Sequence, residues 1–241
     1  MECDIKRGAV NDSGSTVLLV DDEEALRRIL SAGLTARGYL VREASSGEDA
    51  CRIVPTLQPD VIVLDIGLPD IDGVEVTRRL RRLIHTPIII LSVHAMASDK
   101  IAALDAGADD YLTKPCELDT LLDRIRTALC RVMPQDAGVF ASGDLTVDLH
   151  RQMVQLGEKQ IKLTETEYDL LRILVLNPGK LLTQRRLVRE VWEEIGDEEG
   201  LQMLRTTISA LRQKLDVHSE RSCHIMLEPG VGYRLRIAPS T

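Results

Sequence analysis

Five polar residues stand directly after short apolar runs, and their side chains are of the kind that can handle a phosphoryl group. Asp21 and Asp22 follow TVLLV, Asp65 follows DVIVL, Ser92 follows PIIIL, and Lys114 follows DYLT. Carboxylate oxygens without histidine or thiolate favour Mg²⁺. An aspartate beside a bound metal can attack a phosphoryl group, while lysine and serine bind its oxygens. These residue types indicate a phosphoryl-transfer site with Asp65 as the phosphoacceptor.

Each of these residues alone has a simpler explanation. An aspartate after a strand often caps the next helix, and we expect Asp70 and Asp72 to be turn and helix-start residues of this kind. Ser92 could be a loop hydroxyl, and Lys114 could be a solvated surface charge. Only the joint placement of five such residues after apolar runs favours a shared site.

The elements that carry these residues alternate between strand-like and helical patterns. Near-continuous apolar runs separated by helical segments are typical of a parallel sheet covered on both faces, and the runs lie at 16–20, 39–44, 60–64, 87–91 and 110–113. We therefore predict an α/β domain with a doubly wound, five-stranded parallel sheet over residues 16–131. In such a sheet the carboxyl ends of the strands share one edge, which would bring the polar residues together.

The second half of the chain follows a different pattern. A Pro- and Gly-containing stretch at 132–141 reads as a linker, and short strand-like segments follow it. Thr164 and Glu167 form a capping box before a helix, a second helix starts at Thr183, and a third spans 200–216. Two strand-like runs around a Pro-Gly turn close the chain. This order predicts a smaller winged helix-turn-helix domain over 142–238, with residues 1–15 as an N-terminal extension.

Composition limits the classes of function. The chain has 241 residues, enough for two domains, and a net charge of −8. Residues 139–241 hold 14 Lys and Arg against 15 Asp and Glu, so seven of the net negative charges fall on residues 1–138. DNA binding by the second half would require its positive charge to gather on one face. The five scattered cysteines indicate reduced thiols, and without a signal peptide or membrane span a cytoplasmic protein without membrane partners is expected.

One helix carries two parallel stripes. Apolar residues recur through 201–215 at helical spacing, and beside them lies a polar stripe made of Gln202, Arg205, Ser209 and Arg212. Such a helix can pack on a core while it offers hydrogen-bonding side chains to a DNA major groove. A polar stripe is more often only a solvated face, and both interpretations stay open on the residues alone.

The motifs LLVDDEE, VIVLDIGLPDIDG, ILSVHA and GADDYLTKP resemble the receiver domain of two-component response regulators. The chain is similar to the OmpR/PhoB type over about residues 16–237, and closest to the regulators of Kdp potassium-transport operons. The resemblance implies that Asp65 accepts phosphate from a sensor histidine kinase. It implies Mg²⁺ bound by Asp21, Asp22, Asp65 and the Gly67 carbonyl, a cis Lys114–Pro115 bond, and a switch pair formed by Ser92 and Tyr111. A half-buried strand aromatic is the alternative for Tyr111.

The resemblance also implies how the second domain binds double-stranded DNA. Gln202, Arg205, Ser209 and Arg212 would read the major groove, and the preceding helix would contact phosphates through Arg185, Arg186 and Arg189. At the wing, Arg234 would reach the minor groove, and Tyr233 is either core or a phosphate contact. The acidic segment 193–200 would face RNA polymerase, although a plain solvated loop is as good an interpretation.

Phosphorylation would produce a homodimer through the fourth helix, fifth strand and fifth helix, with the ion-pairing residues Lys100, Asp105, Asp109, Asp110 and Arg124. Three departures from the family bear on phosphorylation and dimerisation. Val93 replaces a small residue beside the site, Cys116 replaces a phenylalanine, and Thr120 replaces the glutamate that would pair with Lys100. Asp119 could take over that pairing.

We therefore predict a phosphorylation-controlled DNA-binding transcriptional regulator that is not an enzyme. A phosphorylation-independent DNA-binding protein with a vestigial receiver is the first alternative, suggested by the three departures. A haloacid-dehalogenase-like phosphatase with Asp65 as nucleophile is the second, but that family needs an aspartate where this chain has Gly67.

Overall fold

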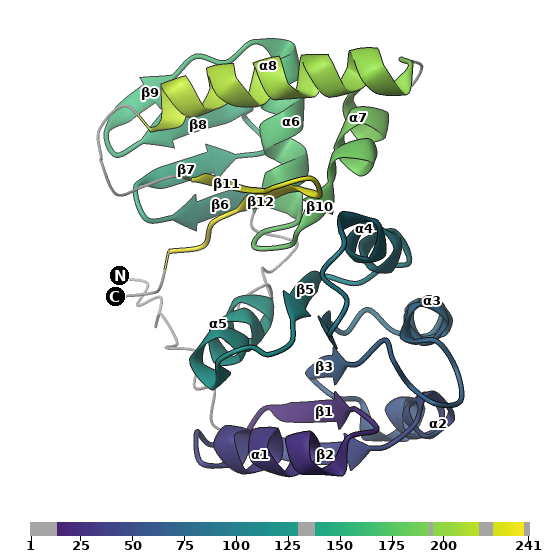
Figure 1. The fold of residues 1–241 in the computed structure, drawn as a ribbon. Helices are drawn as coiled ribbons and strands as arrows, with labels where there is room; N and C mark the ends of the chain where they lie inside the picture. Colours follow the sequence, from purple (N-terminus) through teal and green to yellow (C-terminus); the bar gives the residue numbers. More distant parts are fainter. Residues whose placement is uncertain (1–13, 130–137, 193–194, 217–223, 239–241) are drawn as a thin grey trace, which may run out of the picture.

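The computed structural model describes residues 14–129, 138–192, 195–216 and 224–238. Figure 1 draws the first domain from purple to teal and the second from green to yellow. Most of the expected extension at 1–15 and of the expected linker at 132–141 lies outside the described residues.

The first domain contains the predicted parallel sheet. Its strand order is β2-β1-β3-β4-β5, and the strands are β1 (Thr16–Val20), β2 (Leu40–Ala44), β3 (Val61–Leu64), β4 (Ile88–Ser92) and β5 (Asp110–Thr113). All four neighbouring pairs are parallel. The strand order reverses between β1 and β3, which is where open sheets of this kind bind ligands.

Helices cover both faces of this sheet, and alternation along the strands explains why. Leu18 and Val20 of β1 pack with α2 (Gly47–Leu57), α3 (Gly73–Arg81) and α4 (Ala97–Asp105). Val17 and Leu19 pack on the other face with α1 (Glu24–Thr35) and α5 (Leu118–Leu129). Because successive side chains point to opposite faces, a strand buried on both sides must be apolar throughout.

The second domain begins with a four-stranded antiparallel sheet, β6-β7-β8-β9. Its strands are β6 (Val139–Ser142), β7 (Leu145–Asp148), β8 (Met153–Leu156) and β9 (Lys159–Ile161). The elements that follow are α6 (Glu165–Leu176), β10 (Leu182–Thr183), α7 (Gln184–Trp192), α8 (Asp197–Leu215), β11 (Ile225–Glu228) and β12 (Gly232–Leu235). Strands β10, β12 and β11 form a second sheet, which completes the predicted winged helix.

Two boundaries differ from those expected. Strand β6 starts at Val139, inside the expected linker, because Phe140 alternates into the core of the second domain. Helix α8 starts at Asp197 rather than at residue 200. The acidic segment therefore contributes the first turn of α8, where negative side chains such as Glu198 favour the positive end of the helix dipole.

Other local predictions are confirmed. Thr164 and Glu167 form a reciprocal capping box at the start of α6, and the Lys114–Pro115 bond is cis. Cys51 and Cys116 are free, half-buried thiols, while Cys3, Cys130 and Cys223 lie outside the described residues. Among the residues with described positions, no helix is both long and apolar enough to cross a bilayer.

Candidate functional site

The predicted carboxylates meet at the carboxyl ends of β1 and β3. These two strands are paired, with Val20 opposite Leu64, so the residues that follow them emerge side by side. Ligand oxygens of Asp21, Asp22 and Asp65 all lie within 4.8 Å of one another. Two central strands far apart in sequence thus place three carboxylates at one edge of the sheet.

Lys114 connects two of these carboxylates. Its Nζ donates to Asp21 Oδ2 and to Asp65 Oδ2, each at 2.6 Å. Burial on its own would lower the pKa of Lys114, but hydrogen bonds and attraction from both aspartates outweigh it and hold the pKa above its ordinary value. The ammonium therefore stays charged and balances one of the three negative charges.

The remaining charge suits a divalent cation. Three carboxylates and one ammonium leave two negative charges, and every side-chain donor of the three is a hard oxygen. Asp22 is exposed, whereas Asp21 and Asp65 are buried, so the cluster opens to solvent on the Asp22 side. Gly67 N donates to Asp65 Oδ1 at 3.1 Å, which fixes that carboxylate. The donor set fits Mg²⁺.

The backbone behind Asp65 is tightly packed. A Cβ atom on Gly73 would lie 2.4 Å from the carbonyl oxygen of Asp65 and 2.6 Å from Cα of Ile66. Only glycine permits this approach, so the start of α3 holds the backbone of Asp65 and Ile66 in place. A Cβ on Gly67 would lie 3.8 Å from the Asp65 carboxylate, which is ordinary contact.

Asp70 and Asp72 position helices and take no part in the site. Asp72 caps α3 through a 2.7 Å bond from Val74 N. Asp70 accepts from Gly47 N at 2.9 Å and from Glu48 N at 2.8 Å, at the start of α2. These backbone donors lower the pKa of Asp70 to about 2. The segment after Asp65 is thereby tied to two helices.

The expected switch residues share one neighbour, His94. Ser92 Oγ accepts from His94 N at 3.1 Å, and Tyr111 OH donates to His94 O at 2.6 Å. Tyr111 is buried, and burial raises its pKa above the ordinary value. A rearrangement of the segment after β4 would therefore reach both side chains, and their switching role stays a prediction.

Helix α8 presents three of the expected DNA-reading side chains to solvent: Gln202, Arg205 and Ser209 are exposed. Arg212 is half-buried, and its Nε and Nη2 donate to the Ile225 carbonyl at 3.0 and 2.5 Å. In this conformation Arg212 holds β11 against α8.

The other residues predicted to contact DNA are likewise either exposed or already paired within the protein. Arg185 and Arg189 on α7 are exposed, whereas Arg186 pairs with Glu190 at 2.6 Å. Tyr233 belongs to the core of the second domain, which favours the core interpretation of this residue.

The side chain of Arg234, on strand β12 of the wing, is buried against the first domain. It is only 6% exposed, and its Nη1 and Nη2 donate to Asp110 Oδ2 and Oδ1 at 2.5 and 2.6 Å. Asp110 belongs to β5 of the first domain, and Arg124 lies 3.5 Å from it. In this conformation Arg234 is a contact between domains and is not available to a minor groove.

The rest of the expected dimerisation face also meets the second domain. Its partners lie in residues 180–183 and β11, and the pairs are Lys100–Glu228 at 3.1 Å, Asp105–Thr183 at 2.9 Å and Asp109–Lys180 at 3.1 Å. Figure 1 shows β10 next to α4. No local sequence pattern predicts these partners, because each contact joins residues more than seventy positions apart.

The pairing suggested for Asp119 is not made. Its carboxylate lies 3.3 Å from Arg37 of the same domain, on the exposed side of α1 and α5, while Lys100 is bound to Glu228. Asp119 therefore does not replace the family's glutamate in this conformation.

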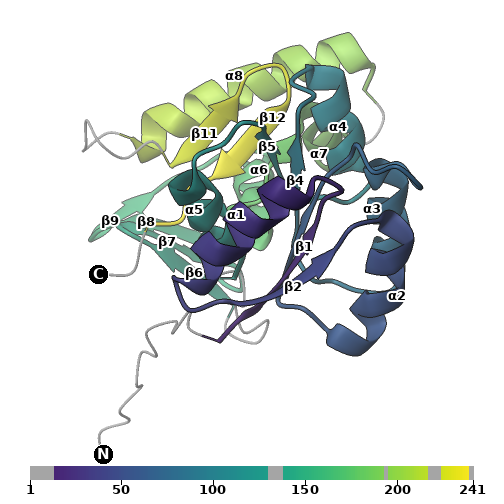
Figure 2. The same cartoon turned by 60° about the horizontal axis from the view of Figure 1, so that its bottom comes forward.

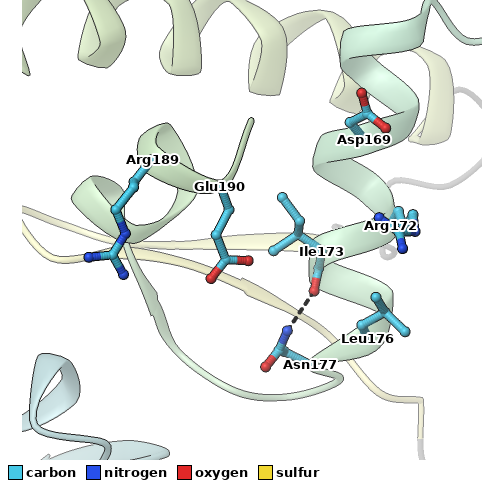
Figure 3. Close-up of a pocket in the computed structure, with 7 residues that line it drawn as sticks. All are labelled: Asp169, Arg172, Ile173, Leu176, Asn177, Arg189 and Glu190. Atoms are coloured by element: carbon cyan, nitrogen blue, oxygen red, sulfur yellow. Dashed lines mark hydrogen bonds between the residues drawn. The ribbon is translucent and has the colours of Figure 1, made fainter. Parts of the chain in front are cut away.

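A separate hollow of about 590 Å³ lies between α6 and α7. Figure 3 shows its lining, in which Asn177 donates to the Ile173 carbonyl at 2.9 Å. Arginines, carboxylates and apolar side chains are mixed along its wall, namely Asp169, Arg172, Ile173, Leu176, Asn177, Arg189 and Glu190. Its lining residues do not form a recognisable catalytic or binding arrangement, and we assign this hollow no role.

Comparison with known proteins agrees with this geometry. Residues 17–126 match the family model of the response regulator receiver domain, and residues 157–235 match that of the transcriptional regulatory protein C-terminal domain. The chain is 43% identical to the KDP operon transcriptional regulatory protein KdpE of Escherichia coli, over 92% of this chain and 100% of the relative. It is 40% identical to KdpE of Mycobacterium tuberculosis, over 90% of this chain and 97% of the relative.

Other relatives extend the comparison. The response regulator MprA of Mycobacterium leprae is 40% identical, over 92% of this chain and 99% of its own length. The solved structure of DrrB, an OmpR/PhoB homolog of Thermotoga maritima, is 30% identical over 92% of this chain and 99% of its own, with a TM-score of 0.48. The sequence matches alone support the family assignment. With a receiver sheet, a winged helix and relatives that match both along most of their length, the chain belongs to the OmpR/PhoB-type two-component response regulators.

Proposed function

We propose that Asp65 is phosphorylated by a sensor histidine kinase and that this modification controls DNA binding. The observation that carries the proposal is the cluster of three carboxylates within 4.8 Å around Lys114. In the transfer, an Asp65 oxygen attacks the phosphorus of a phosphohistidine, a P–O bond forms, and the P–N bond breaks. Lys114 would balance the incoming charge, and the Ser92 hydroxyl would bond a phosphoryl oxygen. Mg²⁺, when bound by Asp21, Asp22, Asp65 and the Gly67 carbonyl, would offset the remaining negative charge.

Phosphorylated chains would dimerise through α4, β5 and α5 and place two winged helices on adjacent half-sites of double-stranded DNA. Gln202, Arg205 and Ser209 are exposed on α8, as major-groove reading requires. We further propose a cytoplasmic regulator that contacts RNA polymerase through the acidic segment 193–200 at the start of α8. The KdpE names of two relatives favour a potassium-transport operon as the target.

The test is phosphotransfer from a small acidic phosphodonor with Mg²⁺, followed by DNA binding. We expect wild type to bind DNA upstream of its own gene more tightly after phosphorylation, and Asp65→Asn to show no such gain. Equal binding by both proteins, with and without the donor, would remove the switching claim and favour a vestigial receiver.

We also propose that the chain is not a phosphatase. The residue two positions after Asp65 is Gly67, which cannot act as the general acid that such an enzyme needs. The chain should form at most one phosphoryl-aspartate per molecule. Sustained turnover of a phosphomonoester would contradict this.

A further inference from the structure

Arg27 is a half-buried side chain beside the proposed metal site. It belongs to α1, and its Nη1 donates to the main-chain carbonyl of Asp21 at 2.6 Å. Its Nε lies 3.6 Å from Glu43 Oε2, on strand β2. Figures 1 and 2 both show α1 next to β1 and β2. One guanidinium therefore connects the segment after β1 to β2.

Helix stability does not explain the position of Arg27. Only three residues of α1 precede it, and a cation near the N-terminus of a helix is opposed by the helix dipole. Helical side chains lean toward the N-terminus, and here that direction brings the guanidinium to Asp21. What the arginine stabilises is therefore the Asp21 carbonyl, not α1.

Every polar group of Asp21 has a partner. Its N donates to Ala44 O at 3.2 Å, Oδ1 accepts from Glu23 N at 2.9 Å, and Oδ2 accepts from Lys114 Nζ at 2.6 Å. The carbonyl oxygen accepts from Arg27. Removal of the arginine would take away the present partner of the carbonyl and leave the other three bonds in place.

The carbonyl of Asp21 belongs to the peptide group that joins Asp21 to Asp22. The Asp22 side chain is exposed, so its position depends mainly on its own backbone. Because the peptide group is planar, a bond from Arg27 to its oxygen fixes the direction in which the chain continues to Asp22. Ligand oxygens of Asp21, Asp22 and Asp65 lie within 4.8 Å of one another, and a rotation of this peptide would separate them.

Glu43 makes this support nearly neutral. A guanidinium beside the site would by itself oppose the binding of a cation, but the Glu43 carboxylate, 3.6 Å from Arg27 Nε, offsets its charge. A lysine could not replace the arginine, because a compact ammonium lacks the planar fork that reaches a carbonyl and a carboxylate together. The pair thus supplies a hydrogen bond without adding net positive charge.

We infer that Arg27 is a positioning residue for the metal site: it holds the Asp21–Asp22 peptide in the conformation that Mg²⁺ binding requires, while Glu43 offsets its charge. Arg27 acts through the two aspartates and not by contact with the metal. The inference rests on the proposed Mg²⁺ site. Loss of a partner that orients a metal ligand lowers metal affinity by about 10- to 100-fold.

The test is isothermal titration of the unphosphorylated full-length chain with Mg²⁺. The double variant Arg27→Met with Glu43→Gln keeps the net charge of wild type and removes the hydrogen bond to Asp21. We expect its Mg²⁺ dissociation constant to rise at least about tenfold. Arg27→Lys keeps the charge and one donor, and its dissociation constant should fall between those of wild type and the double variant.

Hydrogen exchange of the metal-free chain supplies a measurement that does not depend on the metal. We expect faster exchange at the amides of Asp21 and Glu23 in the double variant, since both amides bond within the segment that Arg27 holds. The amides of β3 should stay protected as in wild type. Faster exchange throughout β1 and β3 would mean a general loss of stability and would overturn the inference.

Arg28→Met is the matched control. Arg28 is the next residue of α1, its side chain is 76% exposed, and it pairs with Glu24. The substitution removes the same charge without touching Asp21, so both measurements should match wild type. If Arg27 acted through its charge alone, the double variant would bind Mg²⁺ as wild type does, and that result would overturn the inference.

Asp22→Asn separates this inference from the proposed site. Equal Mg²⁺ affinity of wild type and Asp22→Asn would show that the metal site itself is wrong, and the inference with it. Weaker binding by Asp22→Asn together with wild-type binding by the double variant would overturn the inference alone. Since no arm uses phosphate, a failure of phosphotransfer to Asp65 would be recognised separately.

Discussion

At the scale of single residues, Lys114 both supports and competes with the proposed metal. Its ammonium lies 2.6 Å from oxygens of Asp21 and Asp65, two of the three side chains that would bind Mg²⁺. A unit positive charge about 4 Å from a divalent cation opposes binding by about 2 kcal/mol even in a water-like medium, and by more in a protein. Lys114 therefore keeps metal affinity moderate.

Replacing Lys114 should separate its two roles. We expect Lys114→Gln to bind Mg²⁺ at least about tenfold more tightly, since about 1.4 kcal/mol corresponds to one decade, and to lose the phosphorylation-induced gain in DNA binding. Isothermal titration calorimetry measures the first effect. Lys114→Arg keeps the charge and should stay near the wild-type affinity, and weaker metal binding by Lys114→Gln would contradict this account.

The free energy of unfolding should depend on pH through Asp70. Its pKa is lowered to about 2 by hydrogen bonds from Glu48 N and Gly47 N. Because the folded pKa lies below the ordinary value of 3.8, the stabilisation is fully present above about pH 4 and is lost as the pH falls through about 2.

The measurement is the free energy of unfolding of wild type and Asp70→Asn between pH 2 and pH 7. We expect the variant to be less stable at pH 7 and the gap to close toward pH 2. A gap that is constant over the whole range would show that the carboxylate charge does not matter. Asp60→Asn, which alters another bond to a backbone amide, controls for a general effect of losing a carboxylate.

At the scale of elements, the close approach of α3 to β3 should be the most sensitive point of the receiver. Gly73→Ala would push Cβ into the backbone of Asp65 and Ile66, at 2.4 and 2.6 Å. Overpacking of this kind costs about 1–3 kcal/mol. We expect a lower midpoint of unfolding in urea together with weaker Mg²⁺ binding, because Asp65 is displaced.

Gly67→Ala is the matched control for that change. Its Cβ would lie 3.8 Å from the Asp65 carboxylate, at ordinary contact distance, and neither glycine has a positive φ. We expect Gly67→Ala to shift stability by less than about 0.5 kcal/mol, as ordinary surface changes do. Equal losses in both variants would show that contact distance does not decide the outcome.

The elements themselves could largely be predicted from the sequence, because each depends on a local pattern. The five strands of the receiver sheet are recognisable from strand-like runs such as Val61–Leu64, and the start of α6 from the Thr164–Glu167 box. The site at the edge of the sheet followed from strand direction alone. The starts of β6 and α8 were not predicted correctly. Strand β6 starts early because Phe140 packs in the core of the second domain, and α8 starts early because its acidic first turn is favoured by the helix dipole.

The positions of Arg212 and Arg234 could not be predicted in the same way. Both lie where the family's DNA contacts are expected, yet Arg212 bonds to the Ile225 carbonyl and Arg234 to a carboxylate 124 positions away. Such partners depend on how two domains meet, and no local periodicity records that arrangement.

At the scale of the whole molecule, we expect DNA and the first domain to compete for one wing. Arg234 cannot bind Asp110 and a phosphate group at the same time, so binding of either partner weakens the other by the same factor. Operator DNA should therefore open the unphosphorylated protein.

Hydrogen exchange can show this directly. We expect saturating operator DNA to speed exchange at α4 and β5 of Asp65→Asn, in which phosphate plays no part, while the amides of β1 stay protected. A DNA duplex of unrelated sequence at the same concentration should have a smaller effect. Unchanged exchange at α4 and β5 in the bound state would mean that the wing does not leave the first domain.

The cover over Tyr111 has a consequence for modular engineering. Leu181, Val231 and Arg234, which contact the first domain near Tyr111 and Asp110, belong to the second domain. A receiver domain fused to a foreign output domain would lose these contacts. We expect its α4 and β5 to be more exposed than in the native chain. In the reverse fusion, this winged domain is joined to a related receiver domain. The same contacts should form only where that receiver has a carboxylate at the start of its fifth strand, to bind Arg234.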